Sequence, residues 1–214
     1  MTLTSIYKFI IEPIDGRYTN KVDVDGKELI INSNIENHRF VNRLGKVIST
    51  PIVNNTNIKA GDEVIVHHNV FRRFYDVRGK EKNGGSFFRE NMYLCYEDQI
   101  FLHRNNLSTW NSTDNYCFVK PIVKKSKSAL IDHEKEQPLI GVLKYNNNTL
   151  ESLGFKTGDI VGFTPDSEYE FLIDDQRLYR VTTESIIIKY EHEGNEVEYN
   201  PSWAKSGGGI NQSC

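Results

Sequence analysis

The sequence predicts an all-β protein built from two small β-barrels in tandem, with long flexible loops. An internal repeat is the first observation behind this prediction, because residues 58–64 (IKAGDEV) return as residues 155–161 (FKTGDIV). The second is a series of short runs rich in β-branched and aromatic residues, separated by Gly, Asn, Asp or Pro, which is typical of strands and turns. No long segment shows the apolar periodicity of a helix. Many short strands at close spacing favour a barrel or sandwich, and we expect barrels.

Two further pairs of similar segments flank this repeat, in the same order in both halves of the chain. Upstream, residues 7–14 resemble residues 116–122, and downstream, residues 92–100 resemble residues 178–186. Three anchors recurring in order indicate whole small domains rather than the shorter units of a solenoid. The shared Lys-x-Gly-Asp motif is a predicted turn, because Gly tolerates positive φ and Asp can accept hydrogen bonds from nearby backbone.

The repeat also sets the predicted domain boundaries. We expect a first barrel over residues 1–104, a linker over 105–115, a second barrel over 116–190 and a flexible tail over 191–214. Within the first barrel, the polar, Asn-rich segment at about 15–43 is a predicted mobile loop. Residues from about 76 to 90 are a predicted hairpin insertion, because they contain the turn signal Asn83-Gly84-Gly85.

Composition indicates a soluble cytoplasmic protein. The formal net charge of -3 gives no general attraction to nucleic acid or to anionic membranes. No apolar run approaches the roughly 20 residues of a membrane span, and we expect no signal peptide. Three widely spaced cysteines without a CxxC pair favour a reducing compartment. Richness in Asn, Lys and Ile is typical of an AT-rich genome, such as that of a virus or an organelle. If the source is a virus, the expected location is the host cytoplasm.

Both halves show one order of motifs. An apolar first strand is followed by an aliphatic tripeptide within a loop, a strand that opens with Gly, the Lys-x-Gly-Asp turn, and an acidic residue before an aliphatic last strand. In the second half these are residues 118–123, 129–131, 141–143, 156–161 and 184–188; in the first half, the tripeptide and later motifs are residues 29–31, 45–47, 59–64 and 98–102. Each half resembles the co-chaperonin family, the GroES-type lid of the chaperonin. The resemblance covers roughly residues 6–190, so the chain resembles a tandem, two-domain member of this family.

The resemblance implies GroES-like barrels and a non-enzymatic lid that caps a GroEL-type chaperonin ring ATPase and assists protein folding. It also implies a homo-oligomeric ring without a cofactor or metal. The implied partner-binding residues are the two aliphatic tripeptides, Leu29, Ile30, Ile31 and Ala129, Leu130, Ile131. An exposed aliphatic tripeptide is a liability unless it docks, and burying each residue contributes about 1.5–3 kcal/mol. In the competing interpretation, the first tripeptide is an ordinary core strand.

An alternative function is a nucleic-acid-binding or viral assembly protein that keeps the fold without binding a chaperonin. Residues 71–75 (FRRFY), with Arg78 and Lys80, interleave basic and aromatic side chains as single-strand binders do. The simpler interpretation is a strand with a solvated basic face, so we expect no nucleic acid partner. His67 and His68 would point to opposite faces of a strand, which disfavours a shared metal ion. No catalytic motif is present, and we expect no enzyme activity.

Overall fold

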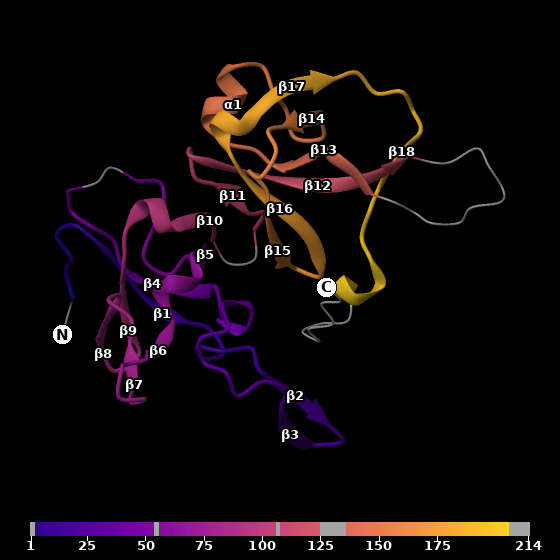
Figure 1. Ribbon diagram of the computed structural model, residues 1–214. Helices are drawn as coiled ribbons and strands as arrows, with labels where there is room; N and C mark the ends of the chain where they lie inside the picture. The colour runs from indigo at the N-terminus through magenta and orange to yellow at the C-terminus, as the bar shows by residue number, and fades with distance from the viewer. Residues whose placement is uncertain (1–2, 54–55, 106–107, 125–135, 206–214) are drawn as a thin grey trace. The chain divides into compact units, whose positions relative to one another are not determined.

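The structure, a computed structural model, describes residues 3–53, 56–105, 108–124 and 136–205. The chain divides into two compact units, Met1–Trp110 (unit 1) and Asn111–Cys214 (unit 2) (Figure 1). The division falls inside residues 105–115, the segment predicted as the linker. Antiparallel strands dominate both units, which confirms the prediction of a mostly β protein.

Unit 1 is organised around an antiparallel sheet with the strand order β10-β5-β4-β1-β9-β8. Two separate hairpins, β2–β3 and β6–β7, lie outside this sheet. The strands are β1 (Phe9–Pro13), β2 (Lys21–Val24), β3 (Lys27–Ile30), β4 (Leu44–Ser49), β5 (Glu63–Val66), β6 (Arg73–Tyr75), β7 (Glu81–Asn83), β8 (Phe87–Arg89), β9 (Met92–Cys95) and β10 (Ile100–Arg104). Three short 3-10 helices connect them: η1 (His38–Phe40), η2 (His68–Val70) and η3 (Glu97–Gln99).

Unit 2 is organised around a second antiparallel sheet, with the order β15-β16-β12-β13-β14-β17, and β18 pairs with the far end of β12. The strands are β11 (Asn111–Ser112), β12 (Tyr116–Lys124), β13 (Glu136–Tyr145), β14 (Ile160–Phe163), β15 (Tyr169–Ile173), β16 (Gln176–Thr182), β17 (Ile186–Tyr190) and β18 (Glu196–Glu198). The helical segments are α1 (Asn148–Ser152), η4 (Thr183–Ser185) and η5 (Ser202–Lys205).

The two sheets have the same strand order and the same register. Strands β10, β5, β4, β1, β9 and β8 of unit 1 correspond in turn to β17, β14, β13, β12, β16 and β15 of unit 2. In unit 1 Phe9 pairs with Cys95, and in unit 2 Cys117 pairs with Val181, so Phe9 corresponds to Cys117. The sequence match of residues 7–14 with residues 116–122 aligns Tyr7 with Tyr116, and therefore Phe9 with Phe118. Strand pairing shows that this alignment is wrong by one residue.

The Lys-x-Gly-Asp turn has one geometry in both units, as predicted. Gly61 and Gly158 both have a φ of +96°, a left-handed value that favours glycine. The carboxylate of Asp62 accepts the Lys59 N–H at 2.8 Å, and that of Asp159 accepts the Lys156 N–H at 2.7 Å. Each glycine N–H also donates at 2.8 Å to a carbonyl of the neighbouring strand, at Val47 or Leu143. The turn therefore ties the start of β5 to β4 and the start of β14 to β13.

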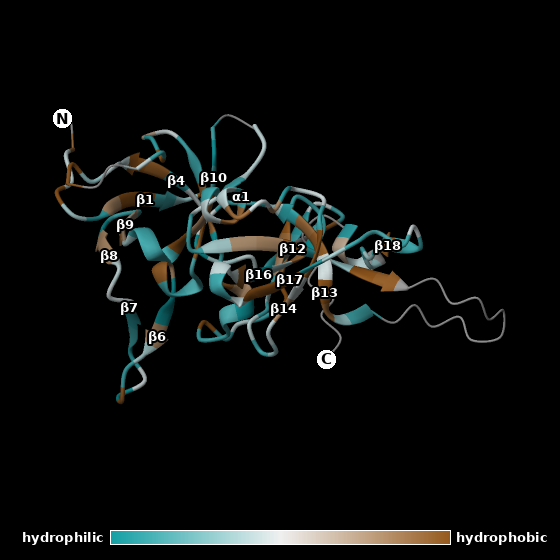
Figure 2. Ribbon diagram, turned by 90° about the horizontal axis from the view of Figure 1, so that it is seen from above, coloured by the Kyte–Doolittle hydropathy of each residue, from teal (hydrophilic) through white to brown (hydrophobic). Residues whose placement is uncertain are grey.

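Each unit has its own hydrophobic core on one face of its sheet. Alternate residues of β1 and β9 point to that face in unit 1, and β12, β13 and β16 supply it in unit 2. Figure 2 shows the apolar character of β12 in brown. The unit 1 core contains Phe9, Ile11, Val41, Val47, Ile58, Val64, Val66, Val70, Phe71, Tyr93, Cys95 and Ile100. The unit 2 core contains Cys117, Val119, Leu143, Leu150, Val161, Phe163 and Val181.

The predicted closed barrels are not found. Within the described ranges, β10 does not pair with β8, and β17 does not pair with β15. The same ranges contain no helix that is both long enough and apolar enough to cross a membrane.

The end of the chain also differs from the predicted flexible tail over residues 191–214. Strand β18 pairs with β12 over Ile122 to Lys124, and Ala204 in η5 is fully buried. The cause is a long-range contact, since the Arg177 guanidinium lies 6.0 Å from the ring centres of both Tyr199 and Trp203. Residues 196–205 therefore belong to unit 2, while residues 206–214 lie outside the described residues.

A substitution at Gly45 tests the close packing beside the turn. A Cβ there would lie 3.0 Å from the Glu12 carbonyl oxygen and 3.1 Å from Cζ of Phe71. We expect Gly45→Ala to lower the free energy of unfolding by about 1–3 kcal/mol, the range for overpacking. Urea denaturation measures the change. Gly85→Ala is the control in the same unit, because a Cβ at that position would have no atom within 4 Å. Equal stability of the two variants would contradict the packing argument.

Candidate partner-binding hairpin

The first predicted tripeptide lies on a two-stranded hairpin formed by β2 and β3. Lys21 pairs with Ile30 and Val24 with Lys27 across the two strands. Asp25 and Gly26 form the turn with φ values of +52° and +77°, the left-handed pair that a tight hairpin turn requires. Figure 1 shows the hairpin projecting away from the sheet of unit 1. The predicted loop over residues 15–43 therefore contains regular structure.

The aliphatic side chains of this hairpin are exposed. Leu29, Ile30 and Ile31 have exposed fractions of 51%, 64% and 45%, and Val24 has 47%. All four residues of β3 are exposed, so neither face of this strand packs against the core. The interpretation of residues 29–31 as a core strand is therefore wrong. Because an isolated two-stranded hairpin is at best marginally stable in water, these apolar side chains gain little from folding alone.

The base of the hairpin, in contrast, is fixed to unit 1. Ile31 N–H donates to the Asn20 carbonyl at 2.9 Å, closing the hairpin beyond its last paired residue. The Tyr18 hydroxyl donates to the Ile35 carbonyl at 2.8 Å and accepts from Arg73 N–H at 2.8 Å. Asn42 Nδ2 donates to the Gly16 carbonyl at 2.6 Å, from a buried position. This base, the stem of the hairpin, thus holds the exposed strands β2 and β3 at a fixed place on unit 1.

The second predicted tripeptide, Ala129, Leu130 and Ile131, lies outside the described residues. The segment before it forms β12, and the segment after it forms β13, which begins at Glu136. The loop therefore joins two paired strands, as the β2–β3 segment joins β1 and β4.

The two neighbouring histidines lie side by side, unlike the predicted strand residues. His67 caps the 3-10 helix η2 and His68 is its first residue, and their ring centres are 4.2 Å apart. The ring of His38 lies 5.2 Å from that of His68. Burial and the nearby positive charges lower the pKa of His68 to about 3. In the part of the chain that the structure describes, no three or more His, Cys, Asp or Glu side chains are arranged so that they could hold a metal ion.

The Arg-rich segment that suggested nucleic acid binding is divided between core and surface. Phe71 is fully buried, whereas Phe74 and Tyr75 are exposed. Arg73 forms an ion pair with Glu81 at 2.5 Å and lies over the Tyr18 ring. The simpler interpretation, a strand with one aromatic face and a solvated basic face, holds only in part, because β6 begins at Arg73 and the Arg73 side chain is ion-paired.

The predicted insertion is a hairpin, but its turn lies elsewhere. Strands β6 and β7 pair from Arg73 to Asn83, around a turn in which the Asp76 carboxylate accepts the N–H groups of Arg78 and Lys80 at 2.9 Å each. Gly84 and Gly85 do begin a turn, since the Phe87 N–H donates to the Gly84 carbonyl at 3.1 Å. This turn leads from β7 to β8 and does not close the β6–β7 hairpin.

Other polar and sulfur groups are structural. Burial raises the pKa of both described cysteine thiols, that of Cys117 to about 12, so Cys95 and Cys117 are poor nucleophiles. Asp174 and Asp175 form the β15–β16 turn, with φ values of +47° and +58°. Glu136 forms an ion pair with Arg177 at 2.6 Å.

Comparison with known proteins gives a partial similarity. The aspartate carbamoyltransferase catalytic subunit of Methanosphaera stadtmanae is 32% identical over 87 residues, which is 36% of this chain and 28% of that protein. This chain therefore spans less than a third of that relative, and the similarity does not assign it to a family. No family model matches the chain.

The histidine cluster makes the stability of unit 1 depend on pH. The pKa of His68 is lower in the folded chain, about 3, than its ordinary value of 6.5, so acid favours the unfolded chain. We expect stability to be complete above pH 6.5 and to fall as pH drops towards 3. His68→Gln should flatten this decline, because glutamine does not titrate. Urea denaturation over this interval measures both profiles, and an equal decline in the variant would exclude His68 as a cause.

Proposed function

We propose that this protein is a co-chaperonin-like lid, built from two GroES-like domains, that docks on a GroEL-type chaperonin ring through the β2–β3 hairpin. In this proposal it is not an enzyme, and it assists protein folding by capping the ring. The observation that carries the proposal is the set of exposed aliphatic side chains, Leu29, Ile30 and Ile31, on a hairpin whose stem is fixed. The repeated strand order supports two related domains.

The energetics of docking follow from the exposure of the hairpin. About half of each of these three side chains is already covered, so docking buries the remainder and contributes about 1 kcal/mol per residue. The fixed stem reduces the entropy that docking costs, because the apolar strand is already positioned. A single hairpin therefore binds weakly.

Tight capping requires several hairpins on one assembly. We propose that the protein forms a homo-oligomeric ring, in which several hairpins reach the same chaperonin. Linked weak sites raise the overall affinity through effective concentration, without any new contact. The Ala129, Leu130 and Ile131 tripeptide would add a second docking segment per chain.

The double variant Ile30→Ser with Ile31→Ser tests the docking role. We expect capture of the chaperonin ring to be lost in the presence of ATP or ADP, because the apolar contact is removed. The free energy of unfolding should change by no more than about 0.5 kcal/mol per substitution, the range for surface positions. Native gel shifts with purified ring measure docking, and a thermal melt measures stability.

A matched control comes from another exposed aliphatic pair of unit 1. Ile52 and Val53 have exposed fractions of 68% and 57%, so Ile52→Ser with Val53→Ser removes similar apolar surface away from the hairpin. This control should dock like the unmodified chain. Failure of the unmodified chain to bind the ring, or equal loss in both variants, would contradict the proposal. Moderate salt should leave docking intact, whereas phosphate contacts to nucleic acid would weaken steeply.

A further inference from the structure

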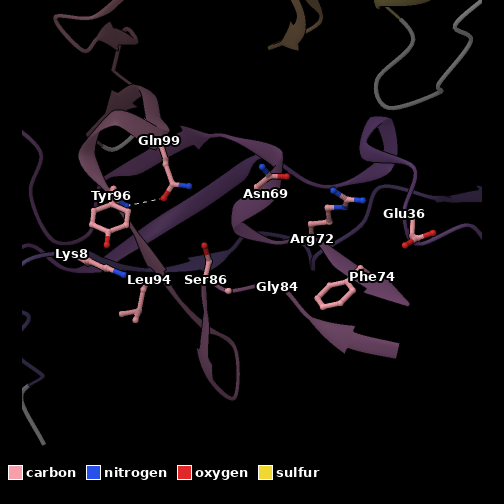
Figure 3. A pocket seen from close by; sticks show the side chains of 11 residues that line it. Lys8, Glu36, Asn69, Arg72, Phe74, Gly84, Ser86, Leu94, Tyr96 and Gln99 are labelled. Carbon is pink, nitrogen blue, oxygen red and sulfur yellow. Dashed lines mark hydrogen bonds between the residues drawn. The ribbon is translucent and has the colours of Figure 1, made fainter. Parts of the chain in front are cut away.

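Unit 1 has an open pocket of about 600 Å³ on the face of its sheet opposite the core (Figure 3). Leu94 of β9 lines it, together with Lys8 and Ser86, which directly precede β1 and β8. Each of these residues is adjacent in sequence to a side chain that packs in or against the core: Phe9 for Lys8, Tyr93 and Cys95 for Leu94, and Phe87 for Ser86. Since side chains alternate between the faces of a sheet, the pocket residues point to the other side.

The equivalent face of unit 2 is filled by the chain itself. Arg180 of unit 2 corresponds to Leu94 of unit 1. In β12 of unit 2, Phe118 pairs with Arg180, and at the equivalent position in β1 of unit 1, Ile10 pairs with Leu94. The Arg180 guanidinium lies 5.0 Å from the ring centre of Tyr116 and 5.8 Å from that of Tyr169.

At the positions that Tyr116 and Tyr169 occupy in unit 2, unit 1 has a more flexible side chain and a smaller one. Lys8 precedes Phe9 as Tyr116 precedes Cys117, so Lys8 corresponds to Tyr116. The Ser86 carbonyl accepts the Leu94 N–H at 2.7 Å, and Tyr169 pairs with Arg180. Because Leu94 corresponds to Arg180, Ser86 corresponds to Tyr169. Unit 1 therefore lacks a ring at the position that Tyr169 fills in unit 2, and the pocket occupies that face.

The pocket has a cation at each end. Figure 3 shows Lys8 beside Tyr96 at one end, and Arg72 with Phe74 at the other, with Leu94, Ser86 and Gly84 between them. Lys8 Nζ lies 4.2 Å from the Tyr96 ring centre. The buried Nε of Arg72 has no hydrogen-bond partner among the described residues.

The pocket contains one acidic side chain, Glu36, against these two cations. One oxygen of Glu36 already accepts the Tyr75 N–H at 3.3 Å. The lining is therefore net positive, and it suits a ligand that carries negative charge.

We propose that this pocket binds an extended peptide segment of another protein in which an aromatic residue adjoins acidic residues. The aromatic ring lies over Leu94 and Ser86, where unit 2 carries the ring of Tyr169. A carboxylate of the peptide meets the guanidinium of Arg72, and a second meets Lys8. Gly85, where a Cβ would have no atom within 4 Å, leaves room for the peptide main chain to approach.

The test uses the full chain and a blocked peptide, acetyl-Gly-Glu-Tyr-Glu-Gly-amide. Amide shifts in a two-dimensional nitrogen-15 NMR titration are expected at Gly84, Gly85, Ser86 and Leu94. Replacing the peptide's Tyr by Ser, or both Glu by Gln, should weaken binding about tenfold each, which corresponds to about 1.4 kcal/mol. Absence of shifts at these residues at saturating peptide would overturn the proposal. Stronger binding of a short oligothymidine at the same residues would overturn it in favour of nucleic acid.

Two variants locate the site. Ser86→Tyr with Leu94→Arg gives unit 1 the residues that fill this face in unit 2, and binding should then fall at least about tenfold. Arg72→Gln keeps the pocket open and should reduce the preference for the acidic peptide over its Gln form, while Lys8 retains the remainder of that preference. If the first variant does not fold, Arg72→Gln is sufficient to test the site. Unchanged affinity and charge preference in Arg72→Gln would contradict the assigned role of Arg72.

Discussion

A carboxylate that accepts the backbone N–H three residues before it sets the strand arrangement in both units. Asp62 and Asp159 hold their turns closed, while Gly61 and Gly158 adopt the left-handed conformation that reverses the chain. The strand that follows each turn pairs with a glycine, so that Gly45 faces Val64 and Gly141 faces Val161. A slip of one residue would move every core side chain to the other face, so the turn determines the core.

The sequence predicted features whose causes are local. The Lys-x-Gly-Asp turns and the strand-rich content depend on a few adjacent residues, and both are present. Features that depend on distant contacts were not predicted. Asn83-Gly84-Gly85 looks like a hairpin turn, but the hairpin closes at Asp76. A Cβ at Gly84 would lie 2.9 Å from the Arg72 carbonyl oxygen, so this glycine allows a close approach between distant segments.

The candidate site shows the same limit. An aliphatic run among polar residues identified Leu29, Ile30 and Ile31, but only the fold shows that β3 has no covered face. The pocket beside Arg72 left no sequence signal, because Lys8, Arg72 and Leu94 converge from segments far apart in the chain. The histidines were misplaced because a 3-10 turn, unlike a strand, lets consecutive rings lie together.

The unequal lengths of the first connections have a kinetic consequence. Strand β1 must find β4 across residues 14–43, whereas β12 finds β13 across residues 125–135, a segment roughly a third as long. For flexible unfolded chains, this ratio makes closure of the shorter loop about 0.9 kcal/mol less costly in entropy. In a chain that repeats one strand order, the later half therefore reaches its first non-local pairing more readily. The long segment that presents the hairpin to solvent also delays the assembly of the unit that carries it.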